Sequence, residues 1–174
     1  MEKISIFLTN LGEYVNGCLV GEWVKLPVPD DKLAEVVARI GGNGQEYFIS
    51  DYETLFSNLH IGKYASITEL NHLAEKVEEL ADFDYDKLAA ALECESNTTI
   101  VEVLGLIEQL DDFDLLTDVF DDAALGEYFT EAGCILHGVV DHILRYFDFE
   151  AYGRDIRLES NICYTSYGAV VDNR

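Results

Sequence analysis

The stretch Ser66–Glu93 reads SITELNHLAEKVEELADFDYDKLAAALE, and here the chain changes from strand-like alternation to acidic helical spacing. Its first residues, Ser66-Ile67-Thr68-Glu69, form a capping box, a pattern typical of a helix N-terminus. The helix predicted after this box places its apolar residues on one face and its acids elsewhere. Asp84 is predicted to cap a second helix over residues 85–93.

Towards the C-terminus, helices continue and then give way to mixed structure. A second capping box, Thr99–Glu102, predicts a helix that reaches Leu110. Asp114 is predicted to start another helix. The last part of the chain predicts helices over residues 122–132 (ended by Gly133) and 139–147, a helix break at Gly153, and weak strands over 156–158, 162–165 and 167–171, with a strand pair around Asn161.

Towards the N-terminus, the pattern predicts a small β-β-α-β unit. Residues 3–9 alternate between apolar and polar and predict a strand, and a turn-rich segment follows. The rest of the unit is predicted as a strand over residues 18–26, a helix over 30–40 and a strand over 46–50. The fold class is therefore α+β, expected as an elongated chain of three small subdomains: residues 1–62, an acidic helical middle over 63–110, and a mixed part over 111–174.

The charge of the chain is large and unevenly distributed. There are 34 acidic and 11 basic residues in 174, a net charge of −23. Residues 69–127 hold eighteen of the acids and only two bases, Lys76 and Lys87. Such a density opposes folding by self-repulsion and predicts a partner of opposite charge. A composition of 49% hydrophobic residues nevertheless indicates a folded chain rather than an acidic disordered tail.

Four dispersed cysteines and the lack of a secretory signal predict a cytoplasmic protein with four reduced thiols. No apolar run approaches the ~20 residues that span a bilayer, and an anionic surface would be repelled by anionic lipids, so no membrane partner is expected. No nucleic-acid partner is expected either.

Motifs for catalysis or metal binding are weak. Asp82, Asp84, Asp86 and Glu93 match positions of a calcium loop, but Lys87 replaces the glycine that the turn requires. The remaining candidates, a zinc pair of His137 and His142, a phosphate loop at the glycines 41, 42 and 44, and a hydrolytic carboxylate pair, lack the necessary spacing or specificity. We therefore expect no catalytic residue, no metal and no cofactor.

The charge pattern favours imitation of nucleic acid. Carboxylates three or four residues apart on a helix lie ~5–6 Å from each other, close to the phosphate spacing of roughly 7 Å along a DNA strand. The predicted acidic surface consists of Glu69, Glu75, Glu78, Glu79, Asp82, Asp84, Asp86, Glu93, Glu95, Glu102, Glu108, Asp111, Asp112, Asp114, Asp118, Asp121, Asp122 and Glu127. Three alternatives remain: a solvated face that only aids solubility, an acidic chaperone or sequestering module for basic proteins, and a hydrolase.

Several segments resemble the ArdA antirestriction family. They are IFLTNLGEYVNGCLVGEW at residues 6–23, FISDYE at 48–53, ITELN at 67–71 and EAYGRD at 150–155, in order over nearly the whole chain. The resemblance implies a curved, three-part, non-enzymatic mimic of bent B-form DNA. It further implies a homodimer that occupies the DNA-binding groove of the methyltransferase core of type I restriction–modification enzymes, carried by mobile genetic elements.

The resemblance also suggests where the dimer contact lies. The family's antirestriction motif should fall near residues 119–133, and Phe120, Tyr128 and Phe129 are its predicted apolar anchors, with ordinary core packing as the alternative. Basic residues gather in the stretch 152–157, where Arg154 is expected to pair with a neighbouring acid in a structural corner, with a partner contact as the alternative.

Overall fold

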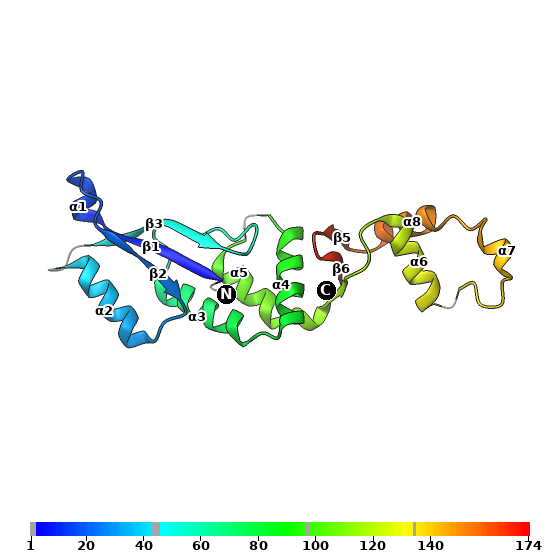
Figure 1. The fold of residues 1–174 in the computed structure, drawn as a ribbon, viewed down its shortest axis with the longest axis horizontal. Coiled ribbons are helices and arrows are strands. Elements are labelled where there is room, and N and C mark those ends of the chain that lie inside the picture. Colours follow the sequence, from blue (N-terminus) through cyan, green and yellow to red (C-terminus); the bar gives the residue numbers. More distant parts are fainter. Residues whose placement is uncertain (1–2, 43–45, 97, 134) are drawn as a thin grey trace. The chain divides into compact units, whose positions relative to one another are not determined.

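The computed structural model describes residues 3–42, 46–96, 98–133 and 135–174 (Figure 1). Helices and two three-stranded antiparallel sheets form these residues, which confirms the α+β class. The chain divides into two compact units. Unit 1 contains Met1–Ala81 and Asn97–Ile107, and unit 2 contains Asp82–Ser96 and Glu108–Arg174. The division into three subdomains stays a prediction.

Unit 1 is built around a sheet with the strand order β2-β1-β3. The central strand β1 (Ile4–Asn10) pairs with β2 (Gly21–Leu26) and β3 (Tyr47–Thr54). Its side chains Ile4, Ile6 and Leu8 are fully buried, as their alternate spacing predicted. The helices of this unit are α1 (Leu11–Val15), α2 (Asp30–Gly41), α3 (Ile67–Glu79) and most of α5 (Ile100–Glu108).

Two buried asparagines join the helices of unit 1 to its sheet. Asn10 accepts a hydrogen bond from the backbone N–H of Glu13 at 2.9 Å and donates one to the Ile40 carbonyl at 2.7 Å. Asn71 of α3 exchanges two 2.9 Å bonds with the backbone of Val28. The cap at Asn10 is the reason that residues 11–15 form a short helix where the sequence predicted only turns.

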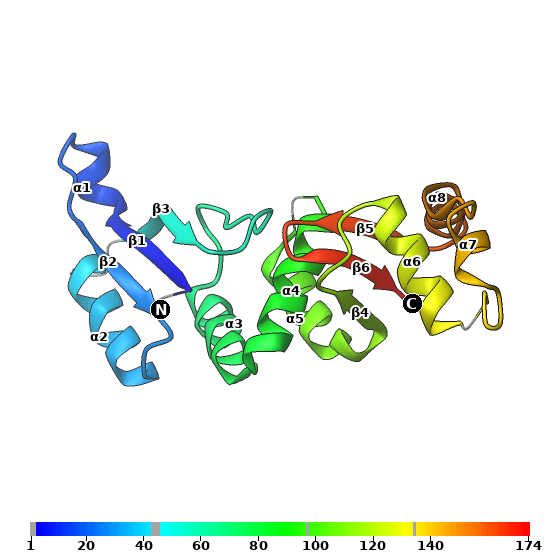
Figure 2. The ribbon, with the colours of Figure 1, turned by 45° about the vertical axis from the view of Figure 1, so that its right-hand side comes forward.

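Unit 2 combines a second sheet with a helix pair. The sheet has the order β4-β6-β5, from β4 (Phe113–Leu116), β6 (Gly168–Asp172) and β5 (Ile162–Thr165). Helix α4 (Asp82–Cys94) packs on this sheet through buried side chains from Leu88 to Leu92 (Figure 2). The remaining elements are the 3-10 helix η1 (Leu110–Asp112), α6 (Asp122–Ala132), α7 (Asp141–Leu144) and α8 (Phe149–Glu159).

Helices α6 and α8 approach each other through two glycines. A Cβ atom on Gly153 would lie 1.8 Å from the Asp122 carbonyl oxygen, and one on Gly126 would lie 2.0 Å from the Phe149 carbonyl oxygen. Gly153 was predicted to break a helix, and this is wrong, because it lies within α8 at a contact that has no room for a side chain. The predicted strand over residues 156–158 is wrong for the same reason, since α8 continues to Glu159.

Three other predictions for the C-terminal half are wrong, and for Asp114 the reason is a strand partner that lies far away in the sequence. Asp114 does not start a helix but lies in β4, opposite Val171 of β6. The last strand pair is β5–β6, and it turns at residues 166–167 instead of Asn161. Within the segment 139–147, only Asp141–Leu144 is helical.

The capping patterns predicted most helix boundaries well. Ser66 accepts a hydrogen bond from the Glu69 N–H, and α3 begins at Ile67. Thr99 and Glu102 form a reciprocal capping box before α5, with Thr99 N–H donating to the Glu102 carboxylate at 2.7 Å. Helix α6 has the bounds predicted from the sequence.

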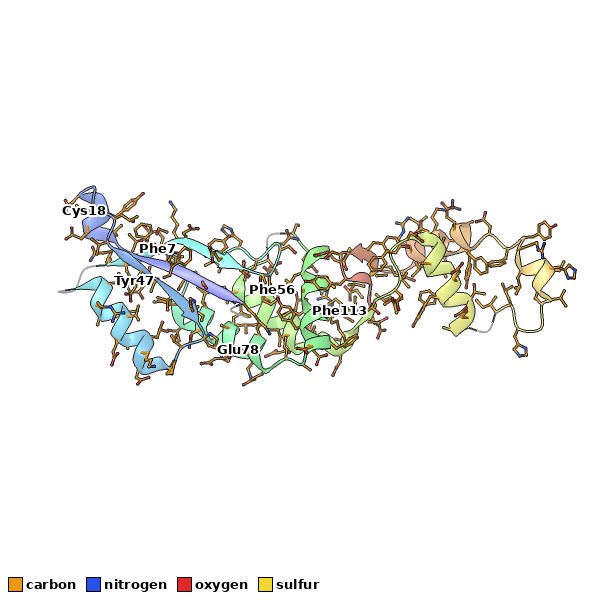
Figure 3. The ribbon with its side chains drawn as sticks, viewed as in Figure 1. Phe7, Cys18, Tyr47, Phe56, Glu78 and Phe113 are labelled. Atoms are coloured by element: carbon orange, nitrogen blue, oxygen red, sulfur yellow. A yellow bond between two sulfur atoms is a disulfide. The ribbon has the colours of Figure 1, made fainter. Side chains whose placement is uncertain are left out.

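The cysteine prediction requires a correction. Cys94 at the end of α4 and Cys163 in β5 form a disulfide, with their Cα atoms 6.0 Å apart. Their separation of 69 residues conceals this pairing, since only the packing of α4 on the sheet brings them together. Cys18 is a free, exposed cysteine between α1 and β2 (Figure 3), and Cys134 lies outside the described residues. Among the described helices, none is both long enough and apolar enough to cross a membrane.

Candidate acidic interaction surface

The eighteen predicted acids lie at the surface. Fifteen are exposed, and Asp84, Glu93 and Asp122 are half-buried. Because a carboxylate that is already bonded within the chain has less capacity to contact a partner, the bonds of each acid decide its role.

Eight of these acids are bonded within the chain. Asp122 binds Arg157 and Tyr164, Glu93 binds Ser166, and Asp121 caps α6. The remaining bonded acids are Glu75 (to Asn71 and His72), Glu79 (to Lys76), Glu95 (to Arg174), Glu102 (to Thr99) and Asp114 (to Asn173). These residues help to hold helix ends and strands in place, in addition to carrying charge.

The other ten acids make no side-chain hydrogen bond or ion pair with any residue that the structure describes. We call them the unpaired acids: Glu69, Glu78, Asp82, Asp84, Asp86, Glu108, Asp111, Asp112, Asp118 and Glu127. Glu69 and Glu78 belong to unit 1, and Glu78 is labelled in Figure 3. The other eight belong to unit 2, where 20 acids and 5 bases give a net charge of −15, against −8 in unit 1.

Asp122 is the most strongly perturbed carboxylate. Arg157 donates to its two oxygens at 2.7 and 3.1 Å, and the Tyr164 hydroxyl donates at 2.7 Å. The hydrogen bonds from Arg157 and then Tyr164 lower the pKa of Asp122 to about 2. Burial, and after it the Asp122 carboxylate, raise the pKa of Tyr164. Asp122 therefore joins α6, α8 and β5 and is charged at neutral pH.

Arg154 forms the expected pair with a neighbouring acid, but the partly buried ion pair of this stretch belongs to Arg157. Arg154 makes only an exposed contact of 3.5 Å to Asp155. Arg157, one turn further along α8, forms the partly buried pair with Asp122. The sequence contained this signal only as a third base near Arg154, with no indication of its partner.

The three predicted dimer-contact residues separate in the structure. Phe120 and Tyr128 are 54% and 42% exposed, so their rings are available to a partner. Phe129 is half-buried and packs against the cluster of Val119, Leu125 and Ala169. Phe129 therefore takes part in the core, whatever else it contacts.

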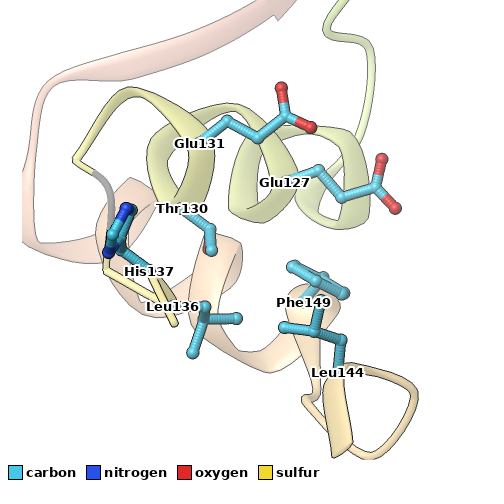
Figure 4. A pocket seen from close by; sticks show the side chains of 7 residues that line it. All are labelled: Glu127, Thr130, Glu131, Leu136, His137, Leu144 and Phe149. Carbon is cyan, nitrogen blue, oxygen red and sulfur yellow. The ribbon is translucent and has the colours of Figure 1, made fainter. Parts of the chain in front are cut away.

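An apolar surface that the sequence did not predict follows α6. Ile135, Val139, Val140, Ile143 and Tyr146 are between 36% and 80% exposed. Beside them is a pocket of about 530 Å³, where Glu127 and Glu131 of α6 lie across from Leu136, Leu144 and Phe149 (Figure 4). The signal in the sequence is the apolar content of residues 139–147, whose pattern predicts one amphipathic helix.

The calcium-loop motif is not a loop in the structure, and part of the glycine motif, Gly44, lies outside the described residues. Asp82, Asp84 and Asp86 lie in the first turns of α4, so this segment is a helix and not a calcium loop. Throughout the described ranges, no three His, Cys, Asp or Glu side chains are grouped to hold a metal ion.

A comparison with protein families gives one match. The model of the antirestriction protein (ArdA) family matches residues 6–171. The chain belongs to the ArdA family. Membership in this family implies an antirestriction function through interaction with restriction enzymes, and members of the family are generally non-enzymatic inhibitors. No curated protein matches the chain.

The residues that resembled ArdA proteins have structural roles in this chain. Asn10 caps α1, Asn71 anchors the segment before α2, and Gly153 permits the α6–α8 contact. Gly21 of β2 has the same role in the first sheet, since a Cβ there would lie 2.4 Å from the Leu8 carbonyl oxygen. None of these four positions is charged, so this part of the family pattern reports the scaffold.

Proposed function

We propose that this ArdA protein is a non-enzymatic mimic of B-form DNA. It occupies the DNA-binding groove of the methyltransferase core of type I restriction–modification enzymes in the cytoplasm, and it blocks both restriction and modification. The observation that supports the proposal is the set of unpaired acids, whose charge remains available to the lysines and arginines of such a groove. The net charge of unit 2 equals that of roughly 26 Å of duplex.

The physical mechanism is electrostatic replacement of phosphates. Asp82 and Asp86 are one helical turn apart on α4, which places their side chains ~5–6 Å from each other. Lys87, the one base on α4, has its ammonium 3.1 Å from the Leu110 carbonyl, and this bond directs it to the chain's own backbone. Because many weak charge contacts share the binding energy, no single unpaired acid should be essential.

Competition binding tests the proposal. The protein is titrated against a type I methyltransferase core bound to labelled duplex, at two salt concentrations. We expect displacement near stoichiometric protein, weakened by salt. The triple variant Asp82→Asn/Asp84→Asn/Asp86→Asn should displace at least ~10-fold less efficiently, on the basis of roughly 0.5 kcal/mol or more for each lost contact.

The matched control removes the same charge from another surface. The variant Asp30→Asn/Asp31→Asn/Glu35→Gln neutralises three exposed acids of α2 that are outside the predicted surface. If both triple variants displaced duplex equally poorly, net charge alone would explain the loss of displacement, and the position of the acids would not matter. Equally tight binding to isolated basic proteins such as histones would favour the sequestering module, and complete loss through one substitution of an unpaired acid would favour a hydrolase.

We also propose that the protein acts as a homodimer through the exposed rings of Phe120 and Tyr128 and the neighbouring apolar surface. Burial of these side chains removes apolar area from water, which stabilises association. In sedimentation, Phe120→Ser/Tyr128→Ser is expected to shift the protein towards monomer. Tyr64→Ser, at a residue of unit 1 that is 76% exposed, is the control and should leave the dimer intact.

A further inference from the structure

The attachment of α4 to unit 2 depends on side chains. Its segment, Asp82–Ser96, is preceded and followed in the chain by residues of unit 1. The neighbouring backbone therefore does not hold this helix against the sheet of unit 2. Burial of Leu88 and Leu92 supplies the apolar contact, as both side chains are fully buried.

Besides the bond of Lys87 to the Leu110 carbonyl, polar and covalent bonds join the C-terminal end of α4 to unit 2. The Glu93 carboxylate accepts two hydrogen bonds from Ser166, from the backbone N–H at 2.7 Å and from the hydroxyl at 2.5 Å. Glu95 lies 3.5 Å from the Arg174 guanidinium. Between these two acids, Cys94 forms the disulfide with Cys163 of β5. Three consecutive residues thus tie the helix end to the β5–β6 hairpin and the C-terminus.

We propose that Cys94 and Cys163 form a reversible redox clamp, which closes under oxidising conditions and is opened by a dithiol reductant. The observation behind it is that two cysteines 69 residues apart meet where α4 is fastened. A cytoplasmic protein is expected to hold its thiols reduced, so the pair changes state when the redox environment changes.

The dithiol reductant supplies the electrons and protons that open the disulfide by thiol–disulfide exchange. Cys94 is exposed and Cys163 is half-buried, so the attacking thiolate reaches the Cys94 sulfur. The S–S bond breaks, Cys163 leaves as a thiolate and takes up a proton, and the reductant forms a mixed disulfide with Cys94. The second thiol of the reductant then releases Cys94 and closes its own disulfide. Two electrons and two protons pass to the protein.

Closing the clamp restricts the unfolded chain across a long loop, which stabilises unit 2 relative to the unfolded state. It also fixes the helix that carries Asp82, Asp84 and Asp86. The effect of the clamp on inhibition rests on the proposed function, whereas its effect on stability does not.

The test compares oxidised and dithiol-treated protein. Alkylation in denaturant followed by mass measurement should find two of the four cysteines protected before treatment and none after it. The thermal midpoint should fall by about 5–15 °C on reduction. The shift should vanish in Cys163→Ala and persist in Cys18→Ala, the matched control at the exposed free cysteine.

Three outcomes would overturn the proposed clamp. Four reactive thiols in the oxidised protein, an unchanged midpoint on reduction, or loss of the shift in Cys18→Ala would each show that Cys94 and Cys163 do not form it. Duplex displacement measured on the same two samples separates the proposals. A midpoint shift in a protein that never displaces duplex leaves the clamp standing and rejects the DNA mimic.

Discussion

The helix pair α6–α8 and the N-terminal part of α4 both carry aspartates, yet they use them differently. In the helix pair, Asp122 is half-buried and bonded to Arg157 and Tyr164, so its charge is used within the fold. In α4, Asp82 and Asp86 are exposed and bonded to no described residue, so their charge faces outward. The comparison teaches that acidic content alone does not define the proposed interaction surface. The bonds of each carboxylate separate the acids that hold the fold from those whose charge remains available to a partner.

The largest effect should come from the α6–α8 contact. Gly153→Ala places a methyl group against the Asp122 carbonyl, and we expect a loss of about 3 kcal/mol or more in the free energy of unfolding. Gly105→Ala is the control, because a Cβ there meets nothing within 4 Å and should stabilise α5 by about 0.5–1 kcal/mol. Urea unfolding followed by circular dichroism measures both. A loss below ~1 kcal/mol for Gly153→Ala would show that the helices separate easily.

A smaller loss of stability is expected when the Asp122 carboxylate, which joins α6 and α8, is neutralised. Asp122→Asn removes the charge that binds Arg157 and should cost about 1–3 kcal/mol. Asp118→Asn, at an exposed unpaired acid, should change stability by no more than ~0.5 kcal/mol. Similar losses of stability for the two variants would contradict the distinction between acids that are bonded within the fold and the unpaired acids.

The ion pair of Asp122 and Arg157 predicts that the stability of the folded protein depends on pH. The pKa of Asp122 falls from an ordinary value of 3.8 to about 2 in the folded protein. A lowered pKa in the folded state contributes stability above pH ~4, and this contribution is lost as the pH falls towards 2. The stability difference between the wild type and Asp122→Asn should therefore be complete at pH 7 and shrink between pH 4 and 2. A difference that stays constant down to pH 2 would contradict the assignment.

The smallest change in stability is expected at Asp121, where two variants distinguish the role of its charge from the role of its hydrogen bond. Asp121 accepts a bond from the Ala124 N–H at the start of α6. Asp121→Asn keeps this acceptor and should change the midpoint of thermal unfolding very little, whereas Asp121→Ala should cost about 1 kcal/mol. If both variants lost the same stability, the charge of Asp121 would matter more than its cap.

Local signals in the sequence predicted the elements whose determinants are local. Ser66 and Thr99 cap helices close to where their patterns placed them, and the alternation of Ile4, Ile6 and Leu8 predicted the central strand. The failures are at positions whose partners are distant. Asp114 lies in a strand because β6 is beside it, and Gly153 lies inside a helix because Asp122 is near it.

The candidate surface shows the same limit. Counting charges located the acidic segment, and the structure places its members at the surface. The count did not reveal that Asp122 is bonded to Arg157, 35 residues later, or that Glu93 is bonded to Ser166, 73 residues later. Only the folded arrangement separates these acids from the unpaired ones.

The interrupted path of the chain through unit 2 also constrains its synthesis. Helix α4 is complete when Cys94 has been made, but its partners β5 and β6 lie between Ile162 and Asp172. A ribosome that adds ~5–20 residues per second needs roughly 3–13 s to make the intervening segment. During this interval β4 (Phe113–Leu116) is the only strand of the second sheet available to α4, so the apolar face of α4 is only partly covered. The high negative charge of unit 2 would keep such unfinished chains apart by repulsion.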